Sequence, residues 1–286
     1  MNGIIIVNKP DNISSQQVVS RIKYKLNKQY KIGHYGTLDP KATGVLPIAV
    51  GKATKLFNFF QDKIKVYRAI FRFGAETDTL DSEGELKNQD NYLPKIDEVQ
   101  NALVDFVGEI KQTPPLYSAN KINGKRAYEL ARNNVEFETK IKDVVVYRFE
   151  LIKQFNASDF LFEIECSSGT YIRSLCRDLA RTLNTVAYMP LLIRTKAGMF
   201  EIFDAISLKE IDELTDLTKV VIPLIDVIDL PIILLDKVNS KKFCNGIKLK
   251  VDNAEGLYKI LDSEQNLLAI GRVSDGVLSM EVYLND

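Results

Sequence analysis

The alternation of apolar and polar positions predicts a chain that mixes strands with helices. A short apolar run at 3–7 ends at a proline, as a strand often does. From the serine pair at 14–15, either of which can cap a helix, apolar side chains recur at helical spacing through 18–26. Residues 66–73 alternate in strand fashion, which places Tyr67 on an apolar face.

The rest of the pattern favours an α+β fold with a mixed or antiparallel sheet, because strands and helices do not alternate regularly. Residues 232–282 contain short strand patterns separated by Asp, Gly and Ser. We therefore expect a large domain at 1–225 and a small β-rich module at 226–286. Within the large domain the pattern predicts helices at 53–60, 96–107, 170–183 and 207–214, strands at 144–155, 160–167 and 191–200, and loops at 31–51, 76–91 and 120–134.

Length and composition narrow the class of protein. With 286 residues, 45% of them hydrophobic, the chain can bury a sizeable core without disulfide or metal support. No apolar run approaches the ~20 residues of a membrane span, and the first residues lack a signal-peptide pattern. The three cysteines, Cys166, Cys176 and Cys244, are widely spaced, as is typical of reduced thiols. These features predict a cytoplasmic protein without membrane contact.

Charge is distributed unevenly along the chain. The net charge is zero, yet residues 1–70 carry 12 Lys and Arg against 3 Asp and Glu, and residues 201–286 carry 9 against 16. Such asymmetry is typical of proteins that bind a polyanion. Ordinary solvated lysines around one helix would give the same count. Charge alone leaves nucleic-acid binding and a solvated basic surface as equal alternatives.

The motifs of cofactor chemistry do not occur in the sequence. There is a single histidine, His34, and no Cys-x-x-Cys, which excludes multi-histidine zinc sites. Gly44 and Gly51 are spaced too widely for a phosphate loop, and Ala53 occupies the position that needs Ser or Thr. We therefore expect neither a metal nor a nucleotide cofactor.

One carboxylate occurs in a loop whose backbone is shaped by glycine and proline. Residues 31–47 contain three glycines, two prolines and a single acid, Asp39. Pro40 holds Asp39 away from helical backbone angles. Asp-Pro is also a common opening of a turn, and the residues alone favour that structural role over catalysis.

Arginines recur at every fourth position in 166–181. Arg173, Arg177 and Arg181 would lie along one face of a helix capped by Thr170 or Ser168. Arg173 falls in the first turn, where the helix dipole disfavours a cation, so a carboxylate or phosphate partner is expected there. For Arg177 and Arg181 the pattern favours an exposed arginine stripe.

The motif at 33–47 and the motif Gly169-Thr170-Tyr171-Ile172-Arg173 resemble the TruB family of bacterial tRNA pseudouridine-55 synthases. Further similarities follow in order across the first 200 or so residues: Asn8-Lys9-Pro10, Lys65-Val66-Tyr67, the segment 114–128 and Arg194-Thr195. The chain departs from the family pattern at Tyr35, Tyr188 and Ile193. At its C-terminal end the resemblance is weaker and suggests a PUA-type or related RNA-binding module.

The resemblance implies an isomerase that converts uridine 55 of the tRNA T-loop to pseudouridine by base flipping and without a cofactor. Asp39 would be the catalytic nucleophile, Arg173 would pair with Asp39, and Tyr67 would stack on the target uracil. The expected substrate-binding residues are His34 beside the base, with Tyr171 and Leu192 lining its pocket.

The resemblance also implies a surface that binds the T-arm of tRNA. Its expected residues are Lys9, Lys121, Lys125 and Arg126, and 119–134 would be a mobile loop that clamps the RNA. The expected assembly is a monomer.

Two other functions fit parts of the sequence. A protein that binds and folds tRNA without catalysis would share the basic segments and the RNA-binding module. A glycoside-type hydrolase would also cleave a glycosidic bond, but it normally pairs two carboxylates. The loop around Asp39 offers one.

Overall fold

The computed structural model describes residues 1–61, 64–118, 121–122, 125–126, 130, 133, 135, 137 and 139–285. The described strands form an 11-stranded sheet, a five-stranded sheet and two short strand pairs. No described helix has the length and apolar character needed to cross a membrane.

The large sheet is mixed, as the sequence predicts. Its strands are β1 (Gly3–Lys9), β2 (Ile32–His34), β3 (Thr43–Val50), β4 (Lys65–Phe73), β7 (Gly108–Gln112), β10 (Lys142–Gln154), β11 (Asp159–Cys166), β12 (Ala187–Ala197), β13 (Phe200–Glu201), β14 (Ile206–Ser207) and β15 (Ile222–Pro223). The main order is β14-β1-β3-β12-β4-β11-β10-β7. The β1–β14 and β3–β12 pairs are parallel, and the other main pairs are antiparallel.

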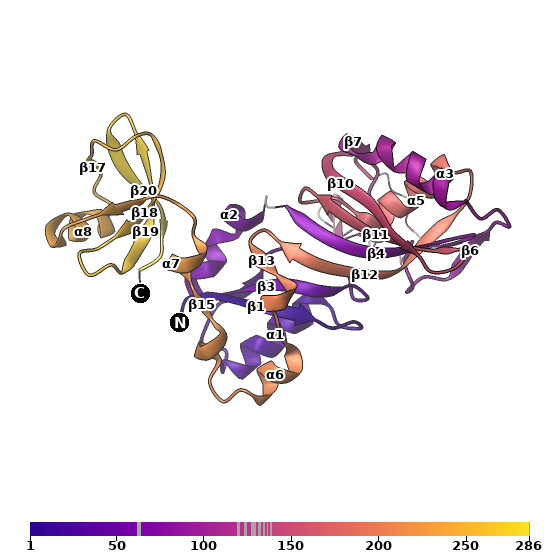
Figure 1. Ribbon diagram of the computed structural model, residues 1–286. Helices are drawn as coiled ribbons and strands as arrows, with labels where there is room; N and C mark the ends of the chain where they lie inside the picture. The colour runs from indigo at the N-terminus through magenta and orange to yellow at the C-terminus, as the bar shows by residue number, and fades with distance from the viewer. Residues whose placement is uncertain are drawn as a thin grey trace.

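The second sheet contains only residues near the C-terminus. Its order is β16-β18-β19-β20-β17, with β16 (Ile232–Leu234), β17 (Leu249–Lys250), β18 (Gly256–Leu261), β19 (Leu267–Ser274) and β20 (Val277–Tyr283). This sheet lies at one end of the molecule, and β7 and β10 lie at the other (Figure 1). The short pairs are β5 (Ala75–Thr77) with β6 (Leu86–Gln89), and β8 (Lys121–Ile122) with β9 (Lys125–Arg126).

The helices are short, and several are single 3₁₀ turns. The α-helices are α1 (Ser15–Lys25), α2 (Phe57–Gln61), α3 (Ile96–Ala102), α5 (Ile172–Thr182), α6 (Leu208–Glu213), α7 (Leu224–Val227) and α8 (Lys237–Cys244). The 3₁₀-helices are η1 (Gly51–Leu56), η2 (Leu103–Phe106), η3 (Ile202–Asp204) and η4 (Leu217–Val220). Helices α3 and α5 lie beside β7, β10 and β11 at one end of the large sheet (Figure 1).

Local sequence explains where α1 begins. Ser14 caps it, because its hydroxyl accepts from the Gln17 amide while the Gln17 side chain accepts from the Ser14 amide. The predicted stripe is buried, with Val18, Val19 and Ile22 at most 4% exposed. This confirms the helix and its cap.

One prediction for the large sheet is wrong. The segment 31–51 was expected to be a loop, yet most of it forms β2 and the buried strand β3, which lies between β1 and β12. Glycine and proline made it look irregular, and Pro47 in particular argues against a central strand. Pro47 is tolerated because its missing N–H faces the end of β2 and not β1: its carbonyl oxygen accepts from the Tyr35 amide, and the N–H and C=O of a strand residue point to the same side.

The C-terminal module contains a helix that the strand pattern did not predict. Asp236 caps helix α8, because its side chain accepts from the Asn239 amide, and the helix buries Phe243. The module has a small apolar core of its own. A second apolar cluster joins Ile270 and Leu284 of the module to Ile4, Ile6 and Val45 of the large sheet.

Candidate active site

Asp39 lies in a loop that joins β2 to β3, and the main chain of this loop is held at every residue from 36 to 40. Ser15 of α1 both accepts from the Leu38 amide and donates to its carbonyl oxygen, at 2.9 and 3.0 Å. The Asp39 carbonyl accepts from the Ala42 amide. Arg194 of β12 donates to the carbonyl oxygens of Gly36 and Thr37, and Lys9 donates to that of Pro40. The loop is therefore fixed before any substrate binds.

The expectation that Lys9 contacts RNA is wrong. Its side chain is fully buried, and its ammonium donates to the carbonyl oxygens of Pro10, Ile13 and Pro40 at 2.7–2.9 Å. Burial lowers the pKa of Lys9 from 10.5 to about 8, although the charges of Asp39 and Asp11 oppose the shift. Lys9 therefore supports the Asp39 loop through its hydrogen bond to the carbonyl oxygen of Pro40.

Arg173 brings the two predicted motifs together. It is the second residue of α5, and its Nη2 lies 2.9 Å from Oδ2 of Asp39. The same nitrogen donates to the carbonyl oxygen of Tyr117 at 3.0 Å, and Nη1 donates to that of Thr79 at 2.9 Å. The anionic partner that the helix dipole suggested for Arg173 is thus Asp39, and their catalytic roles stay predictions.

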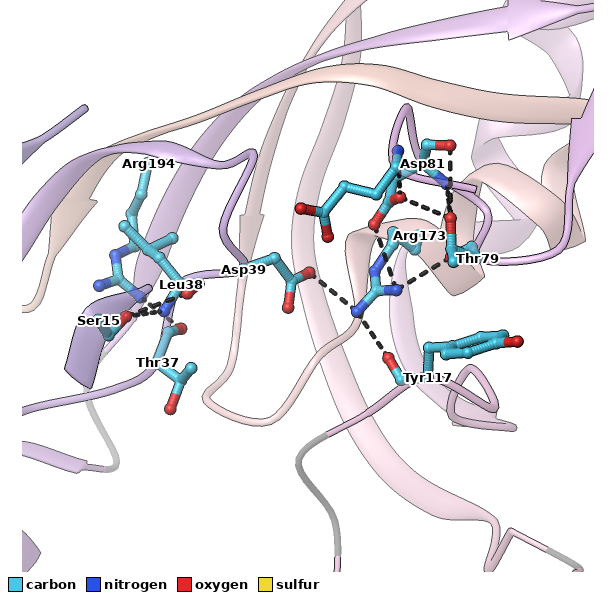
Figure 2. Close-up of polar contacts among 10 residues, drawn as sticks. Ser15, Thr37, Leu38, Asp39, Thr79, Asp81, Tyr117, Arg173 and Arg194 are labelled. Atoms are coloured by element: carbon cyan, nitrogen blue, oxygen red, sulfur yellow. Dashed lines mark hydrogen bonds and ion pairs between the residues drawn. The ribbon is translucent and has the colours of Figure 1, made fainter. Parts of the chain in front are cut away.

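A second carboxylate contacts Arg173 from the opposite side. Oδ2 of Asp81 lies 3.3 Å from Nη1, so the guanidinium stands between Asp39 and Asp81 (Figure 2). The other oxygen of Asp81 accepts from the Thr79 hydroxyl at 2.6 Å and from the Glu83 amide at 2.9 Å. Asp81 is therefore a fixed, fully satisfied partner.

Sequence reasoning missed Asp81 because it lies in a segment with five acids between 76 and 85, which looked like a solvated acidic loop. No pattern marked one of them as buried. A usable signal existed in Thr79 two residues before it, since a hydroxyl and a carboxylate at that spacing commonly close a local turn.

The two carboxylates differ in their access to solvent. The side chain of Asp39 is 37% exposed, whereas those of Asp81 and Arg173 are 5% and 6% exposed. A reactive group needs to reach its substrate, and of these two carboxylates Asp39 meets that condition. Glu83 also borders the site, where burial and then the charges of Asp81 and Asp39 raise its pKa.

Tyr67 and Leu192 share one face of the large sheet. The register pairs Tyr67 of β4 with Arg194 of β12, and Ala69 with Leu192. Tyr67 is 7% and Leu192 8% exposed, and both belong to the apolar cluster that also contains Leu38. Burial raises the pKa of Tyr67, which keeps its hydroxyl protonated at neutral pH.

Tyr171 is placed by the side chain of a buried residue. The Gln112 amide accepts from the Tyr171 main-chain N–H at 2.7 Å and donates to its carbonyl oxygen at 3.1 Å. The ammonium of Lys142 stands 5.5 Å from the centre of the Tyr171 ring. Gln112 therefore fixes the main chain just before α5, and with it the start of the helix that carries Arg173.

His34 lies at the end of β2, directly before this loop. Burial and the charge of Arg194 lower the pKa of His34, so the imidazole is neutral at pH 7. Its Nδ1 is buried and has no hydrogen-bond partner among the described residues.

The remaining RNA-binding residues stay untested. The side chains of Lys121, Lys125 and Arg126, and most of the predicted clamping loop 119–134, lie outside the described residues. Within that segment, the main chain of β8 and β9 forms a short antiparallel pair.

Among the described residues no cluster of His, Cys, Asp and Glu could hold a metal ion.

Tyr35 and Tyr188, two of the positions that depart from the family pattern, have structural roles. The Tyr35 hydroxyl donates to the carbonyl oxygen of Ala53, and its ring stacks on Phe60 with centroids 4.8 Å apart. The Tyr188 hydroxyl accepts from Arg72 at 3.2 Å.

The exposed position predicted for Arg177 is wrong. Arg177 is 9% exposed and donates to the carbonyl oxygen of Thr113.

Comparison with known sequences points to one family. The family described as TruB family pseudouridylate synthase (N terminal domain) matches residues 23–172. A tRNA pseudouridine synthase B from Alkaliphilus oremlandii is 43% identical over 224 residues, 78% of this chain and 74% of that protein. One from Clostridium kluyveri is 37% identical over 282 residues, 96% of each chain. One from Clostridium tetani is 44% identical over 252 residues, 87% of this chain and 86% of that protein.

Solved structures share the fold over nearly the whole chain. A chain from a structure of an H/ACA RNP bound to a substrate RNA containing 2'-deoxyuridine superposes with a TM-score of 0.72 at 24% identity, covering 99% of this chain and 85% of that one. A chain from a Cbf5-Nop10-Gar1 complex gives 0.71 at 25% identity, with 99% and 84% covered. Because the coverage includes the C-terminal sheet, these structures share both sheets with the present chain.

Proposed function

The chain belongs to the TruB family of pseudouridylate synthases, and we propose that it converts uridine 55 in the T-loop of tRNA to pseudouridine. The relatives named tRNA pseudouridine synthase B, which match at up to 96% of their length, support tRNA as the substrate. The observation in the structure that carries the proposal is the exposed carboxylate of Asp39, held 2.9 Å from a buried arginine.

The reaction is an isomerisation that needs no redox partner. The bond from N1 of uracil to C1′ of the ribose breaks, the base turns, and a bond from C5 to C1′ forms. The hydrogen on C5 leaves as a proton, and N1 gains one. A carboxylate that adds covalently and later departs divides this exchange into two easier steps. The solvent access of the Asp39 side chain and the fixed main chain around it support that role.

Arg173 serves Asp39 in two ways under this proposal. Its guanidinium at 2.9 Å stabilises negative charge on the carboxylate, and Asp81 together with two carbonyl oxygens prevents the guanidinium from moving away. A nucleophile held in this way meets its target with little loss of freedom, which is a large part of enzymatic rate enhancement.

The flipped base would lie against the apolar face around Tyr67 and Leu192. Extruding a base from a folded RNA costs a few kcal/mol, and stacking on an aromatic ring returns about 1–3 kcal/mol. Tyr67 would supply the stacking, Leu192 and Tyr171 the walls, and neutral His34 the contact at the start of the loop. Residues 119–134 would clamp the T-arm through Lys121, Lys125 and Arg126.

Beyond the site, we assign catalysis to residues 1–225 and an RNA-binding role to the module at 226–286. The chain would act as a monomer in the cytoplasm. The basic excess in residues 1–70 supports RNA as the partner, because exposed lysines there can replace counterions along phosphates.

Tritium release tests the reaction. Incubated with tRNA that carries tritium at uracil C5, the protein should release tritium to water, and mass mapping should place pseudouridine at position 55. Asp39→Asn should bind tRNA but release none, whereas Asp105→Asn, a control at an exposed acid in η2, should behave as the wild type.

Other outcomes identify the alternatives. Free uracil as the product would indicate a hydrolase. If Asp39→Asn, which should lack isomerase activity, restores the full biological role in a deletion strain, that role is tRNA binding or folding. Normal release by Asp39→Asn would remove Asp39 from the site.

A further inference from the structure

The Asp39 loop contacts a buried cation that the reaction scheme does not use. Arg194 of β12 is 1% exposed, and no carboxylate oxygen of the described residues lies within ion-pair distance of it. Its guanidinium hydrogen-bonds the side chain of Tyr67 and donates to three main-chain carbonyl oxygens: Nε to Val45 at 2.7 Å, Nη2 to Gly36 at 3.1 Å and Nη1 to Thr37 at 3.4 Å. Burying a charge without an opposite charge is expensive. For stability alone, an uncharged side chain would be the cheaper choice.

The three carbonyl groups that accept from Arg194 lie before and after Asp39 in the sequence. Gly36 and Thr37 precede Asp39, and Val45 follows it at the start of β3. One planar guanidinium thus connects the two arms of the loop, and Figure 2 shows Arg194 on the side of the loop away from Arg173. The guanidinium is suited to connecting the two arms, because its five N–H donors lie in one plane and fix several acceptors in one geometry.

Gly44 allows β12 to come this close, and Gly36 provides the turn that faces the guanidinium. At Gly44, with φ +99°, an added Cβ would lie 2.2 Å from the carbonyl oxygen of Arg194. At Gly36, with φ +102°, an added Cβ would lie 3.6 Å from Nη1 of Arg194. Both positive φ values disfavour any residue other than glycine.

Arg194 also lies beside the residue proposed to stack on the base. The register places Arg194 directly opposite Tyr67 in the β12–β4 pair. Burial raises the pKa of Tyr67, and the charge and hydrogen bond of Arg194 partly oppose that rise, as expected when the two groups are in contact. The same side chain therefore contacts the loop that carries the carboxylate and the ring that would hold the base.

We infer that Arg194 is a positioning residue that sets the distance between the Asp39 carboxylate and the Tyr67 ring. It acts through the main chain of Gly36, Thr37 and Val45 and touches neither the reacting atoms nor solvent. This inference rests on the proposed function, since it concerns the geometry of the isomerisation.

Arg194→Lys tests it, because lysine keeps the charge but has one nitrogen and cannot hold both arms of the loop. We expect the single-turnover rate of pseudouridine formation to fall at least tenfold, while the dissociation constant for tRNA changes less than about twofold. A merely structural residue would not separate the two quantities in this way. Arg177→Lys is the matched control, because Arg177 is also buried and its only main-chain acceptor among the described residues is Thr113, outside the loop. It should leave the rate unchanged.

Gly36→Ala provides a second test that leaves the charge in place. A methyl group at this positive φ strains the turn and should displace the Gly36 carbonyl from Nη2 of Arg194. The same loss of rate with unchanged tRNA binding is expected, even if Arg194→Lys does not fold.

Three results overturn the inference: a normal rate in Arg194→Lys, an equal slowing in Arg177→Lys, or loss of tRNA affinity in step with rate. The wild-type assay distinguishes these from failure of the proposed function. If the wild-type protein forms no pseudouridine, the proposed function itself fails.

Discussion

At the scale of single residues, the site depends on one guanidinium shared by two carboxylates. Arg173 uses different nitrogens for Asp39 and Asp81, at 2.9 and 3.3 Å. Asp81 is buried and accepts three further hydrogen bonds through its side chain and carbonyl oxygen. Its own position is therefore set without Arg173, and it fixes the guanidinium. Under the proposed function, the exposed acid would react while the buried acid holds Arg173 in place.

Substitutions on either side of this guanidinium should slow the reaction to different extents. Arg173→Lys removes the bridge, because one ammonium cannot face both carboxylates, and we expect a loss of about 100-fold or more in rate with tRNA binding retained. Asp81→Asn keeps an acceptor but loses its charge, and a loss of about tenfold is expected. Single-turnover kinetics and filter binding measure both effects. Asp178→Asn, whose partner is Arg177, is the control, and equal losses in all three variants would contradict the arrangement.

Lys9 should make stability depend on pH above neutrality. Burial lowers its pKa to about 8 from 10.5. Between these values the folded protein has released a proton that the unfolded chain still binds, so the free energy of unfolding rises with pH in that window. Relative to Lys9→Met, the wild type should gain up to about 3 kcal/mol between pH 8 and 10.5 and nothing below pH 8. Denaturant titrations of both proteins measure this difference, and a constant difference across the window would refute it.

Family resemblance identified part of this site from the sequence, because the residues alone favoured a structural turn role for Asp39. Asp39, Arg173 and Tyr67 occur in recognisable motifs, and the dipole argument indicated an anion beside Arg173. The same reasoning assigned Lys9 to the surface, because a sequence does not show that carbonyl oxygens converge on its ammonium. Asp81 was missed for the related reason that burial of one acid among five depends on tertiary packing.

At the scale of elements, the close approach of β3 to β12 determines where the Asp39 loop begins and ends. The parallel pairing of Ile193 with Thr43 and of Arg194 with Gly44 occurs directly after the loop. The sequence predicted a strand near β12 but took β3 for a loop. Its glycine and proline were taken as signs of irregular structure, although Gly44 is needed for close packing between strands.

Gly44→Ala should therefore destabilise the fold by more than backbone strain alone. The new Cβ would meet the Arg194 carbonyl oxygen at 2.2 Å, and neither strand can yield without breaking the pair. We expect a loss of about 3 kcal/mol or more, together with a lower reaction rate.

Gly108→Ala is the control for backbone strain. Gly108 has a similar φ of +105°, but nothing lies within 4 Å of its added Cβ. It should cost about 1 kcal/mol. Thermal unfolding of both variants compares the two costs, and equal losses would show that strain, and not collision, dominates at Gly44.

At the scale of the whole molecule, the charge gradient is real but overstates the basic surface. Of the 12 cations in residues 1–70, Lys9 and Lys65 are buried. Arg21 and Arg68 pair with Asp212 and Glu163, which lie far away in the sequence. Counting charges by segment cannot detect such pairing. The exposed lysines of α1 and the following turn, among them Lys23, Lys28 and Lys31, remain as candidates for phosphate contacts.

Salt dependence should show how much of this surface binds RNA. Each phosphate contact contributes about 0.7–0.9 to the slope of log affinity against log salt. If Lys23, Lys28 and Lys31 contact phosphates, replacing all three by Gln should lower the slope by about 2–3. Lys209→Gln, in the acidic C-terminal part of the chain, should leave it unchanged. A slope that is flat in the wild type would refute the electrostatic footprint.

The two sheets share enough apolar surface to unfold together. Ile270 of β19 and Leu284 are at most 4% exposed within a cluster that includes Ile4, Ile6 and Val45 of the large sheet. The ammonium of Lys55 in η1 also donates to the carbonyl oxygen of Tyr283, which ties the module to the large sheet from outside the core. An independent module would instead present a polar surface at this junction.

We therefore expect one cooperative thermal transition for the full chain, with calorimetric and van't Hoff enthalpies that agree. Ile270→Ala, in the shared cluster, and Phe243→Ala, in the module's own core, should each cost about 2–5 kcal/mol. Both should lower the midpoint of the same transition. Two separate transitions, with Phe243→Ala moving only one of them, would contradict this coupling. In that case the module at 226–286 would be a domain whose stability is independent of the large sheet.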